Sequence, residues 1–381
     1  MKKILKKTER FFKNFFIAAV LLPLRNQKNI PIPDPGSVDS VLVLRPDRIG
    51  DFIVSVPALR AIKGAMKKDA VFTVVAGSRA KEPAKMYFRD SRIIVYKKGV
   101  WGIISVCLKL IKNKYDVTVN LHSYPFSVTS AFMTLCAGSK TRIGFSQASG
   151  RKIKAAEKIY NKGVRLNDDS MHEVLKNRIL ADMFVKTKPQ DREPLKDMYV
   201  VPEIPEKIRE KAADYFMKNG LLSGGVLIGV HPTLVKKDNR WKKENYIELC
   251  RKLMDEQNAK IVVFSGFGET EELNEFREMA ESSGVMLSYY PYKDIISIMA
   301  GAGLCRLFIC NDSGVMHACA LVTGLIAVFG PMDPERWGPL GPGKIAVLQA
   351  EDRQCDSVAP MQVYEKAAEL LKSENSSPAE L

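Results

Sequence analysis

The stretch Val41-Leu42-Val43-Leu44-Arg45-Pro46-Asp47-Arg48-Ile49-Gly50-Asp51 opens with a short run of apolar, β-branched residues and ends in a glycine-bearing turn. The apolar residues Val56, Leu59 and Ile62 follow at helical spacing, so a strand, a turn and a helix are predicted. The same alternation continues along the chain from Ser40. It is typical of βαβ units and predicts a parallel sheet with helices on its faces.

The alternation occurs twice along the 381 residues, a length that exceeds what one hydrophobic core normally supports. We therefore expect an α/β protein of two Rossmann-like doubly wound domains, residues 36–190 and 206–360, facing an interdomain cleft. A charged, proline-bearing stretch provides a linker at 191–205, and a helix and polar tail follow at 361–381. Strands are expected at 41–45, 71–76, 93–96, 117–121, 226–230, 260–265, 305–310 and 325–329, and helices at 243–257 and 269–282.

The net charge of +15 is concentrated at the N-terminus, where the first 30 residues contribute +7. The body of the chain has no RNA-recognition signature, zinc-finger spacing or basic stretch interleaved with aromatic residues, so a nucleic-acid partner is not expected. Seven cysteines without a Cys-x-x-Cys fit neither a disulfide framework nor a structural zinc site. We expect them in the cores of a cytoplasmic protein.

Residues 1–35 combine a basic, phenylalanine-rich arm with a short proline-bearing spacer. The apolar run from Phe15 to Leu22 is eight residues long, too short for the roughly 20 needed to span a bilayer. A secretory signal or a disordered tail is an alternative, but no small-x-small cleavage site follows. We favour an amphipathic helix that attaches residues 1–25 to an anionic membrane surface, which predicts a peripheral protein on the inner face of the cytoplasmic membrane.

Reactive side chains follow the first expected strand. Asp51 falls in the first helical turn, where a carboxylate either caps free amides or is placed to take a proton from a sugar hydroxyl. Spacing alone leaves both roles open. Arg45 and Arg48 could attract an anionic acceptor, and His122 directly follows the strand expected at 117–121.

Three groups follow strands of the second half. Thr233 precedes Lys236, Lys237 and Arg240. This segment is either a phosphate clamp or a solvated basic loop. The segment Asn311-Asp312-Ser313-Gly314-Val315-Met316-His317 suits a helix start whose amides bind a diphosphate. Glu269 follows a glycine turn, where it could hold ribose hydroxyls or cap the next helix.

Taken in order, these segments resemble the family 9 glycosyltransferases, the family of the ADP-heptose:lipopolysaccharide heptosyltransferases. The resemblance extends from about residue 40 to 341. It depends on Arg45 with Ile49-Gly50-Asp51 and Pro57-Ala58-Leu59-Arg60, and on Asn311-Asp312-Ser313-Gly314 with His317. Further matches are Phe329-Gly330-Pro331, Trp337-Gly338-Pro339, Arg142-Ile143-Gly144-Phe145 and His172-Glu173.

The resemblance implies a GT-B fold and an inverting, metal-independent transfer from a nucleotide sugar to a glycolipid or oligosaccharide acceptor, with heptose from ADP-heptose as the default. It makes Asp51 the general base. The chain departs from the family at Asn239, where a lysine is usual, and at Lys242, where proline is common. The assigned acceptor-binding residues are Arg45, Arg48, Gly50 and His122; the donor-binding residues are Thr233, Lys237, Arg240, Glu269, Asp312, Ser313, Gly314, Val315 and His317. We expect no metal, no cofactor and a monomer.

Other functions remain open at the level of sequence. A nucleotide-sugar hydrolase or epimerase could use the same two domains, and a non-catalytic sugar-nucleotide-binding or membrane-scaffold protein could retain the fold. A nicotinamide-dependent enzyme is disfavoured because the first turn lacks Gly-x-Gly-x-x-Gly. The absence of Asp-x-Asp favours helix amides and cations over a divalent metal at the diphosphate.

Overall fold

The computed structural model describes residues 30–122, 126–148, 151–166, 168, 170–234 and 239–372. The predicted membrane-binding residues 1–25, the candidate Lys237 and the end of the polar tail lie outside the described residues. The chain divides into two compact units between Met198 and Tyr199, a point inside the range 191–205.

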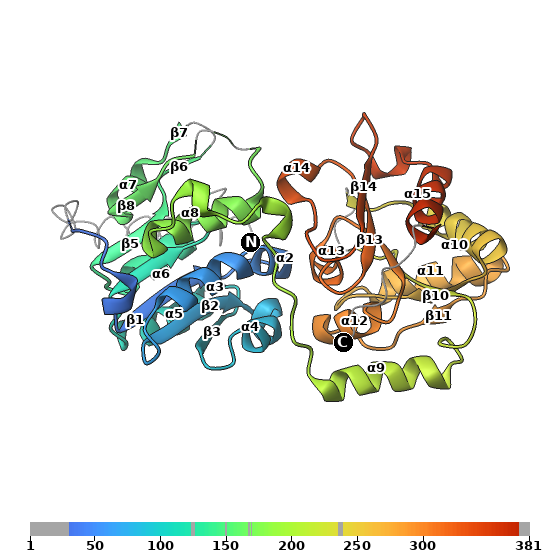
Figure 1. The fold of residues 1–381 in the computed structure, drawn as a ribbon, viewed down its shortest axis with the longest axis horizontal. Helices are drawn as coiled ribbons and strands as arrows, with labels where there is room; N and C mark the ends of the chain where they lie inside the picture. The colour runs from blue at the N-terminus through green and yellow to red at the C-terminus, as the bar shows by residue number, and fades with distance from the viewer. Residues whose placement is uncertain are drawn as a thin grey trace. The chain divides into compact units, whose positions relative to one another are not determined.

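The N-terminal unit is built on a parallel sheet of six strands in the order β3-β2-β1-β4-β5-β8 (Figure 1). The strands are β1 (Ser40–Arg45), β2 (Val71–Gly77), β3 (Arg92–Tyr96), β4 (Val117–Asn120), β5 (Thr141–Phe145) and β8 (Lys162–Val164). The α-helices are α2 (Ile49–Ile53), α3 (Val56–Ala65), α4 (Lys81–Tyr87), α5 (Val100–Ile111), α6 (Val128–Cys136), α7 (Lys154–Ile159) and α8 (Glu173–Val185). An antiparallel ribbon pairs β6 (Gln147–Ala148) with β7 (Arg151–Lys152).

The C-terminal unit repeats this plan with a parallel sheet of six strands in the order β11-β10-β9-β12-β13-β14 (Figure 1). The strands are β9 (Val226–His231), β10 (Ala259–Val263), β11 (Ser288–Tyr289), β12 (Leu307–Asn311), β13 (Gly324–Phe329) and β14 (Ile345–Gln349). The α-helices are α9 (Glu206–Lys218), α10 (Lys243–Gln257), α11 (Thr270–Ser282), α12 (Ile295–Ala302), α13 (Gly314–Cys319), α14 (Pro334–Trp337) and α15 (Pro360–Lys372).

Helices pack on both faces of the N-terminal sheet, as a doubly wound fold requires. Leu42 and Leu44 of β1 share one core with residues of α5 and α6. Because alternate residues of a strand point to opposite faces, Val41 and Val43 point the other way. Here α3 packs closely against α8. In the C-terminal unit, α10, α11 and α15 share a core with β9, and α12 packs against α9 and α13.

Both sheets reverse their strand order beside a central strand. From β1 the chain builds outward through β2 and β3, then returns to add β4 on the other side, and β9 and β12 repeat this arrangement. The register pairs Leu44 with Asn120 and His231 with Cys310. Ligands of such sheets bind beyond the carboxyl ends of the strands at this reversal. The residues after β1 and β4, and after β9 and β12, are therefore where each site is expected.

The predicted α/β fold with two doubly wound domains is confirmed, and each predicted strand is found within two residues of its expected bounds. The helix predicted at 243–257 is α10, and the one predicted from 269 begins at Thr270. Besides the two-residue strands β6 and β7, four strands of the two large sheets, β5, β8, β11 and β14, were not predicted. Three of them contain only two to five residues with polar or glycine positions among them, and β14 is partly exposed throughout, so the apolar signal of a buried strand is weak.

The cysteines occupy the cores, as predicted: six of the seven are buried and all seven are free thiols. Among the described residues, no helix combines the length and the apolar character needed to cross a bilayer.

A leucine-to-alanine change inside the N-terminal core should lower the free energy of unfolding more than the same change on the solvent side of α5. Leu44 is fully buried in β1, so Leu44→Ala leaves a cavity and should lower the free energy of unfolding by about 2–5 kcal/mol. Leu108 of α5 is 56% exposed, so Leu108→Ala should cost less than about 1 kcal/mol. Urea denaturation followed by circular dichroism measures both; equal losses would contradict the assigned burial.

Candidate active site

A buried arginine organises the loop after β1. Arg45 is the last residue of the strand, and only 2% of its side chain is exposed. Its Nη1 donates to the carbonyl of Leu121 after β4 at 2.7 Å, and its Nε donates to the carbonyl of Asp51 at 3.0 Å. These two hydrogen bonds fix the plane of the guanidinium. They also connect the loop after β1 to the loop after β4, where the strand order reverses.

Two carboxylates compensate this buried charge. Arg45 Nη2 lies 3.5 Å from Oδ1 of Asp51, and Nη1 lies 3.6 Å from Oδ2 of Asp47. Oδ2 of Asp51 also accepts the backbone amide of Arg48 at 3.2 Å, so the helix-capping role is confirmed for this residue. Capping does not occupy the whole carboxylate, since 22% of the Asp51 side chain is exposed.

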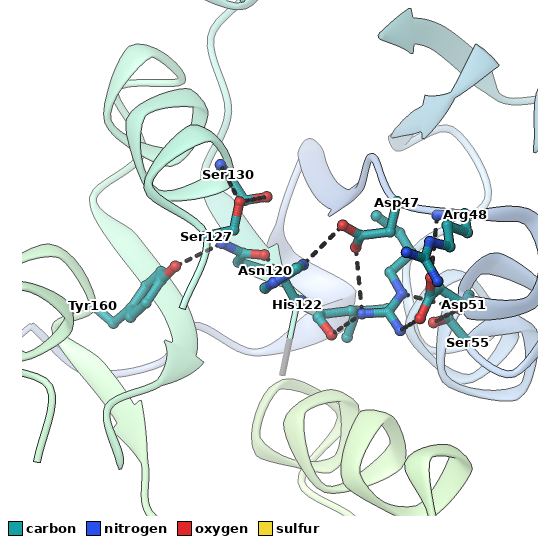
Figure 2. Close-up of polar contacts among 11 residues, drawn as sticks. Asp47, Arg48, Asp51, Ser55, Asn120, His122, Ser127, Ser130 and Tyr160 are labelled. Atoms are coloured by element: carbon teal, nitrogen blue, oxygen red, sulfur yellow. Dashed lines mark hydrogen bonds and ion pairs between the residues drawn. The ribbon is translucent and has the colours of Figure 1, made fainter. Parts of the chain in front are cut away.

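His122 joins the same cluster, as Figure 2 shows. Its Nδ1 lies 2.9 Å from Oδ1 of Asp47, and because a carboxylate can only accept, Nδ1 carries the hydrogen. Burial raises the pKa of Asp47, but the hydrogen bond from His122 and the charge of Arg45 lower it, and the net pKa lies below its ordinary value. Asp47 therefore stays ionised and fixes the tautomer of His122.

The backbone of His122 is positioned by a second polar chain. Its amide donates to Oδ1 of Asn120 at 3.1 Å, and the Asn120 amide group donates to the Tyr160 hydroxyl at 2.6 Å (Figure 2). Asn120 and Tyr160 are buried, so these hydrogen bonds stabilise the loop after β4 from the side of the core.

The structure thus brings Asp51 together with Arg45 and His122, as expected for one site. Gly50 is buried inside the short α2, and Arg48 contributes its amide to Asp51 while its side chain is exposed. Asp47 was not predicted as a site residue, although a carboxylate two positions after a strand end was the available signal.

The C-terminal unit has a buried carboxylate, Glu269, in the loop after β10, and it contacts residues at the end of β9. Oε2 of Glu269 accepts three hydrogen bonds: from Thr233 Oγ1 at 2.6 Å, from the Gly266 amide at 2.6 Å and from His231 Nε2 at 3.0 Å. Burial raises the pKa of Glu269, but the charge and hydrogen bonds of these partners lower it to about 2. Two predicted residues, Thr233 and Glu269, therefore lie in direct contact.

The loop after β12 forms the second part of this unit's site. Asn311 is buried; its side chain accepts the Trp241 amide at 2.8 Å and donates to the His231 carbonyl at 3.4 Å. The adjacent Asp312 accepts Nδ2 of Asn239 at 2.6 Å. The residue that replaces the family lysine thus contacts the carboxylate of the predicted diphosphate loop.

Ser313 begins α13 by accepting the Met316 amide at 3.3 Å, while Gly314 and Val315 form its first turn. His317 is buried in the same helix. Helix α13 contains only six residues, and diphosphate binding at its start stays a prediction.

Arg240 has partners of its own. It forms an ion pair with Glu272, Nη1 to Oε2 at 2.6 Å, and its Nη2 donates to the Leu234 carbonyl at 2.6 Å. Lys243 also pairs with Glu272. The charge of Arg240 is therefore already compensated, and its role at the donor stays a prediction, as does that of Lys237 outside the described residues.

A comparison with protein-family models decides which enzymes this architecture belongs to. The model described as glycosyltransferase family 9 (heptosyltransferase) matches residues 103–367, more than half of the chain. The chain belongs to glycosyltransferase family 9. The matched residues contain the whole C-terminal sheet, whereas Arg45 and Asp51 precede them.

Similar proteins agree with this family assignment. The lipopolysaccharide heptosyltransferase 2 of Escherichia coli is 24% identical over 79% of this chain and 85% of its own. Among solved structures, a family 9 glycosyl transferase from Veillonella parvula has a TM-score of 0.73 at 20% identity, covering 90% of this chain and 99% of its own. The Escherichia coli ADP-heptose lps heptosyltransferase II has a TM-score of 0.69 at 22% identity, covering 87% and 98%. The fold is GT-B, and the protein is a glycosyltransferase.

The buried contacts of Glu269 in this family 9 enzyme predict a specific acid sensitivity. Since its pKa falls from 4.5 to about 2 on folding, the carboxylate stabilises the protein fully above about pH 4.5, and this contribution is lost as pH falls toward 2. It amounts to on the order of 3 kcal/mol. Denaturant unfolding of wild type and Glu269→Gln across this window should give a flatter pH dependence for the variant. Parallel curves would contradict the assigned contacts.

Proposed function

We propose that this glycosyltransferase moves heptose from ADP-heptose onto a lipopolysaccharide-core or related glycolipid acceptor, with inversion and without a metal ion. The similarity to heptosyltransferases, one of them named for ADP-heptose, supports this donor and acceptor class. The N-terminal unit binds the acceptor and the C-terminal unit binds the nucleotide sugar.

The observation that carries the proposal is that contacts fix the carboxylate of Asp51 in position after β1, where the strand order of the N-terminal sheet reverses. Arg45 and the Arg48 amide orient it, and its partial exposure leaves room for a hydroxyl. These contacts fix the orientation of the carboxylate, so Asp51 acts through its position.

In the proposed step, Asp51 takes the proton of an acceptor hydroxyl while the oxygen attacks the anomeric carbon. A new carbon–oxygen bond forms on the face opposite the nucleotide, and the bond to the diphosphate breaks. ADP leaves with the electron pair, so its negative charge grows in the transition state. Inversion follows from this single displacement.

The leaving diphosphate is stabilised by groups of the C-terminal unit. The amides at Gly314 and Val315 donate to phosphate oxygens, and Thr233, whose hydroxyl donates to Glu269, belongs to the same proposed site. Asp312 adds negative charge near the diphosphate, and its hydrogen bond to Asn239 disperses that charge. Glu269 holds His231 and Thr233 in place and binds nucleoside hydroxyls. His317 and Lys237 complete the residues proposed to bind the nucleotide sugar. Arg240 is a further cation of this group.

We further propose that the enzyme is a monomer held at the inner face of the cytoplasmic membrane. The basic, phenylalanine-rich residues 1–25 supply attraction to anionic lipids and apolar anchoring. The glycolipid acceptor then lies in the same surface as the enzyme.

Transfer assays with a panel of nucleotide sugars, with and without a lipopolysaccharide-core acceptor, test this function. We expect product only with the acceptor present, ADP-heptose as the best donor, and unchanged rates after a chelator is added. Free sugar or isomerised donor formed without acceptor would instead indicate a hydrolase or epimerase. Loss of activity under chelation would overturn the metal-free mechanism.

Asp51→Asn should reduce the transfer rate by roughly 10²- to 10⁴-fold while donor binding stays unchanged. Asparagine retains an oxygen that can accept the Arg48 amide, so folding should be preserved. Kinetics together with calorimetric titration of ADP-heptose measure the two effects. Asp47→Asn is the matched control: it removes the charge beside His122 and should have the smaller effect. Full activity of Asp51→Asn, or a larger loss in Asp47→Asn, would move the base to the Asp47–His122 pair.

A further inference from the structure

Helix α5 of the N-terminal unit is apolar on the side that faces solvent as well as on the side that faces the core. Its buried side consists of Ile103, Val106, Cys107 and Leu110, which belong to the core shared with β1. On its outer side stand four large apolar side chains at spacings of three, four and three residues. We call these the α5 stripe: Trp101, Ile104, Leu108 and Ile111, exposed by 82%, 41%, 56% and 63%.

The spacing places the α5 stripe along one line of the helix surface, because residues three and four apart are neighbours on a helix. Single exposed apolar residues are normal on protein surfaces and need no explanation, but a continuous row of four does. Other strongly exposed apolar side chains in the described chain, such as Met286 and Phe267, stand singly on loops of the C-terminal unit.

Lysines surround the α5 stripe at both ends. Lys97 and Lys98 precede the helix, Lys109 and Lys112 lie in and after its last turn, Lys114 follows, and all five are exposed. From residue 91 to 115 the sequence contains no aspartate or glutamate. The nearest following carboxylate, Asp116, is bound by the amides of Asp39 and Ser40.

The start of the helix is held tightly against the loop that carries the first two lysines. A side-chain carbon added to Gly102 would lie 1.6 Å from the Lys97 carbonyl oxygen, so the two backbones pack with no space between them. The adjoining Gly99, with a φ of 120°, makes the turn into the helix. Trp101 is therefore exposed from an ordered helix end.

We propose that the α5 stripe is a membrane-docking surface that takes an anionic phospholipid bilayer. A row of tryptophan, isoleucine and leucine flanked by lysines, without acidic residues, matches the chemistry of helices that lie in the membrane interface. Trp101 sits at headgroup level, Leu108 and Ile111 enter the acyl boundary, and the lysines contact lipid phosphates. This surface is separate from residues 1–25 and gives the N-terminal unit a second attachment.

Two observations favour a bilayer over a second copy of the chain. Lysine is depleted in protein interfaces relative to the rest of the surface, whereas lysines flank the stripe at both ends. A twelve-residue helix face is also small against the roughly 800 Å² that each partner of a stable dimer buries.

Vesicle co-sedimentation of the full-length protein tests the proposal. The probes are phosphatidylcholine vesicles with and without phosphatidylglycerol. Trp101→Ser combined with Leu108→Ser should weaken binding to the anionic vesicles by at least about tenfold. The matched control, Phe267→Ser with Met286→Ser, removes two equally exposed apolar side chains of the other unit and should bind like wild type. A stripe variant that sediments like wild type would overturn the proposal.

A second readout separates the stripe from the arm and from a dimer. Lipids brominated near the headgroup should quench wild-type tryptophan fluorescence, and Trp101→Phe should remove most of this quenching, because Trp241 is buried and Trp337 is partly buried in α14 of the C-terminal unit. Unchanged quenching in Trp101→Phe, or a loss of binding only when Phe15 and Phe16 are changed to serine, would contradict docking through α5. So would a dimer that the stripe variant dissociates while vesicle binding is unaffected.

The stripe lies outside the proposed catalytic and donor-binding residues. The Trp101→Ser, Leu108→Ser variant should therefore keep its rate on a water-soluble fragment of the acceptor. Failure of vesicle docking and failure of the proposed transfer reaction are thus distinguishable.

Discussion

The buried guanidinium of Arg45 is the constraint on which the arrangement of the N-terminal site residues depends. A charge removed from water is costly unless it is paired and hydrogen-bonded, so its neighbours must supply carbonyls and carboxylates in defined positions. The Leu121 and Asp51 carbonyls and the Asp47 and Asp51 side chains meet this requirement. Satisfying one buried charge therefore aligns the loop after β1 with the loop after β4.

The C-terminal unit solves the equivalent problem with the opposite charge. A buried carboxylate, Glu269, accepts hydrogen bonds from two segments: His231 and Thr233 at the end of β9, and the Gly266 amide in the turn after β10. Arg45 ends β1, where the strand order of the N-terminal sheet reverses, whereas Glu269 follows β10 and contacts residues at the end of β9, the strand beside the reversal of the C-terminal sheet. Such preorganised polar groups suit a reaction in which charge moves without a large change of the protein.

Asn239 stands where the family resemblance predicts a lysine. It is a neutral donor that contacts Asp312, and Arg240 is engaged by Glu272. The proposed diphosphate site therefore relies largely on backbone amides and on cations outside these two positions. Basic residues are instead abundant around α5 and at the N-terminus, where the proposed partner is a lipid surface.

The sequence by itself determined the two-fold α/β plan, because apolar period is a local property: strands such as Val41 to Arg45 and the helix at 243–257 are visible in their own residues. It also located Asp51, Thr233, Glu269 and Asp312 by motif. Only the tertiary structure decided which of these residues touch. The pairing of Asp47 with His122, of Arg240 with Glu272 and of Asn239 with Asp312 joins positions 75, 32 and 73 residues apart. The order of the strands in the sheets brings such residues together. Neither their spacing in the chain nor their residue type reveals these contacts.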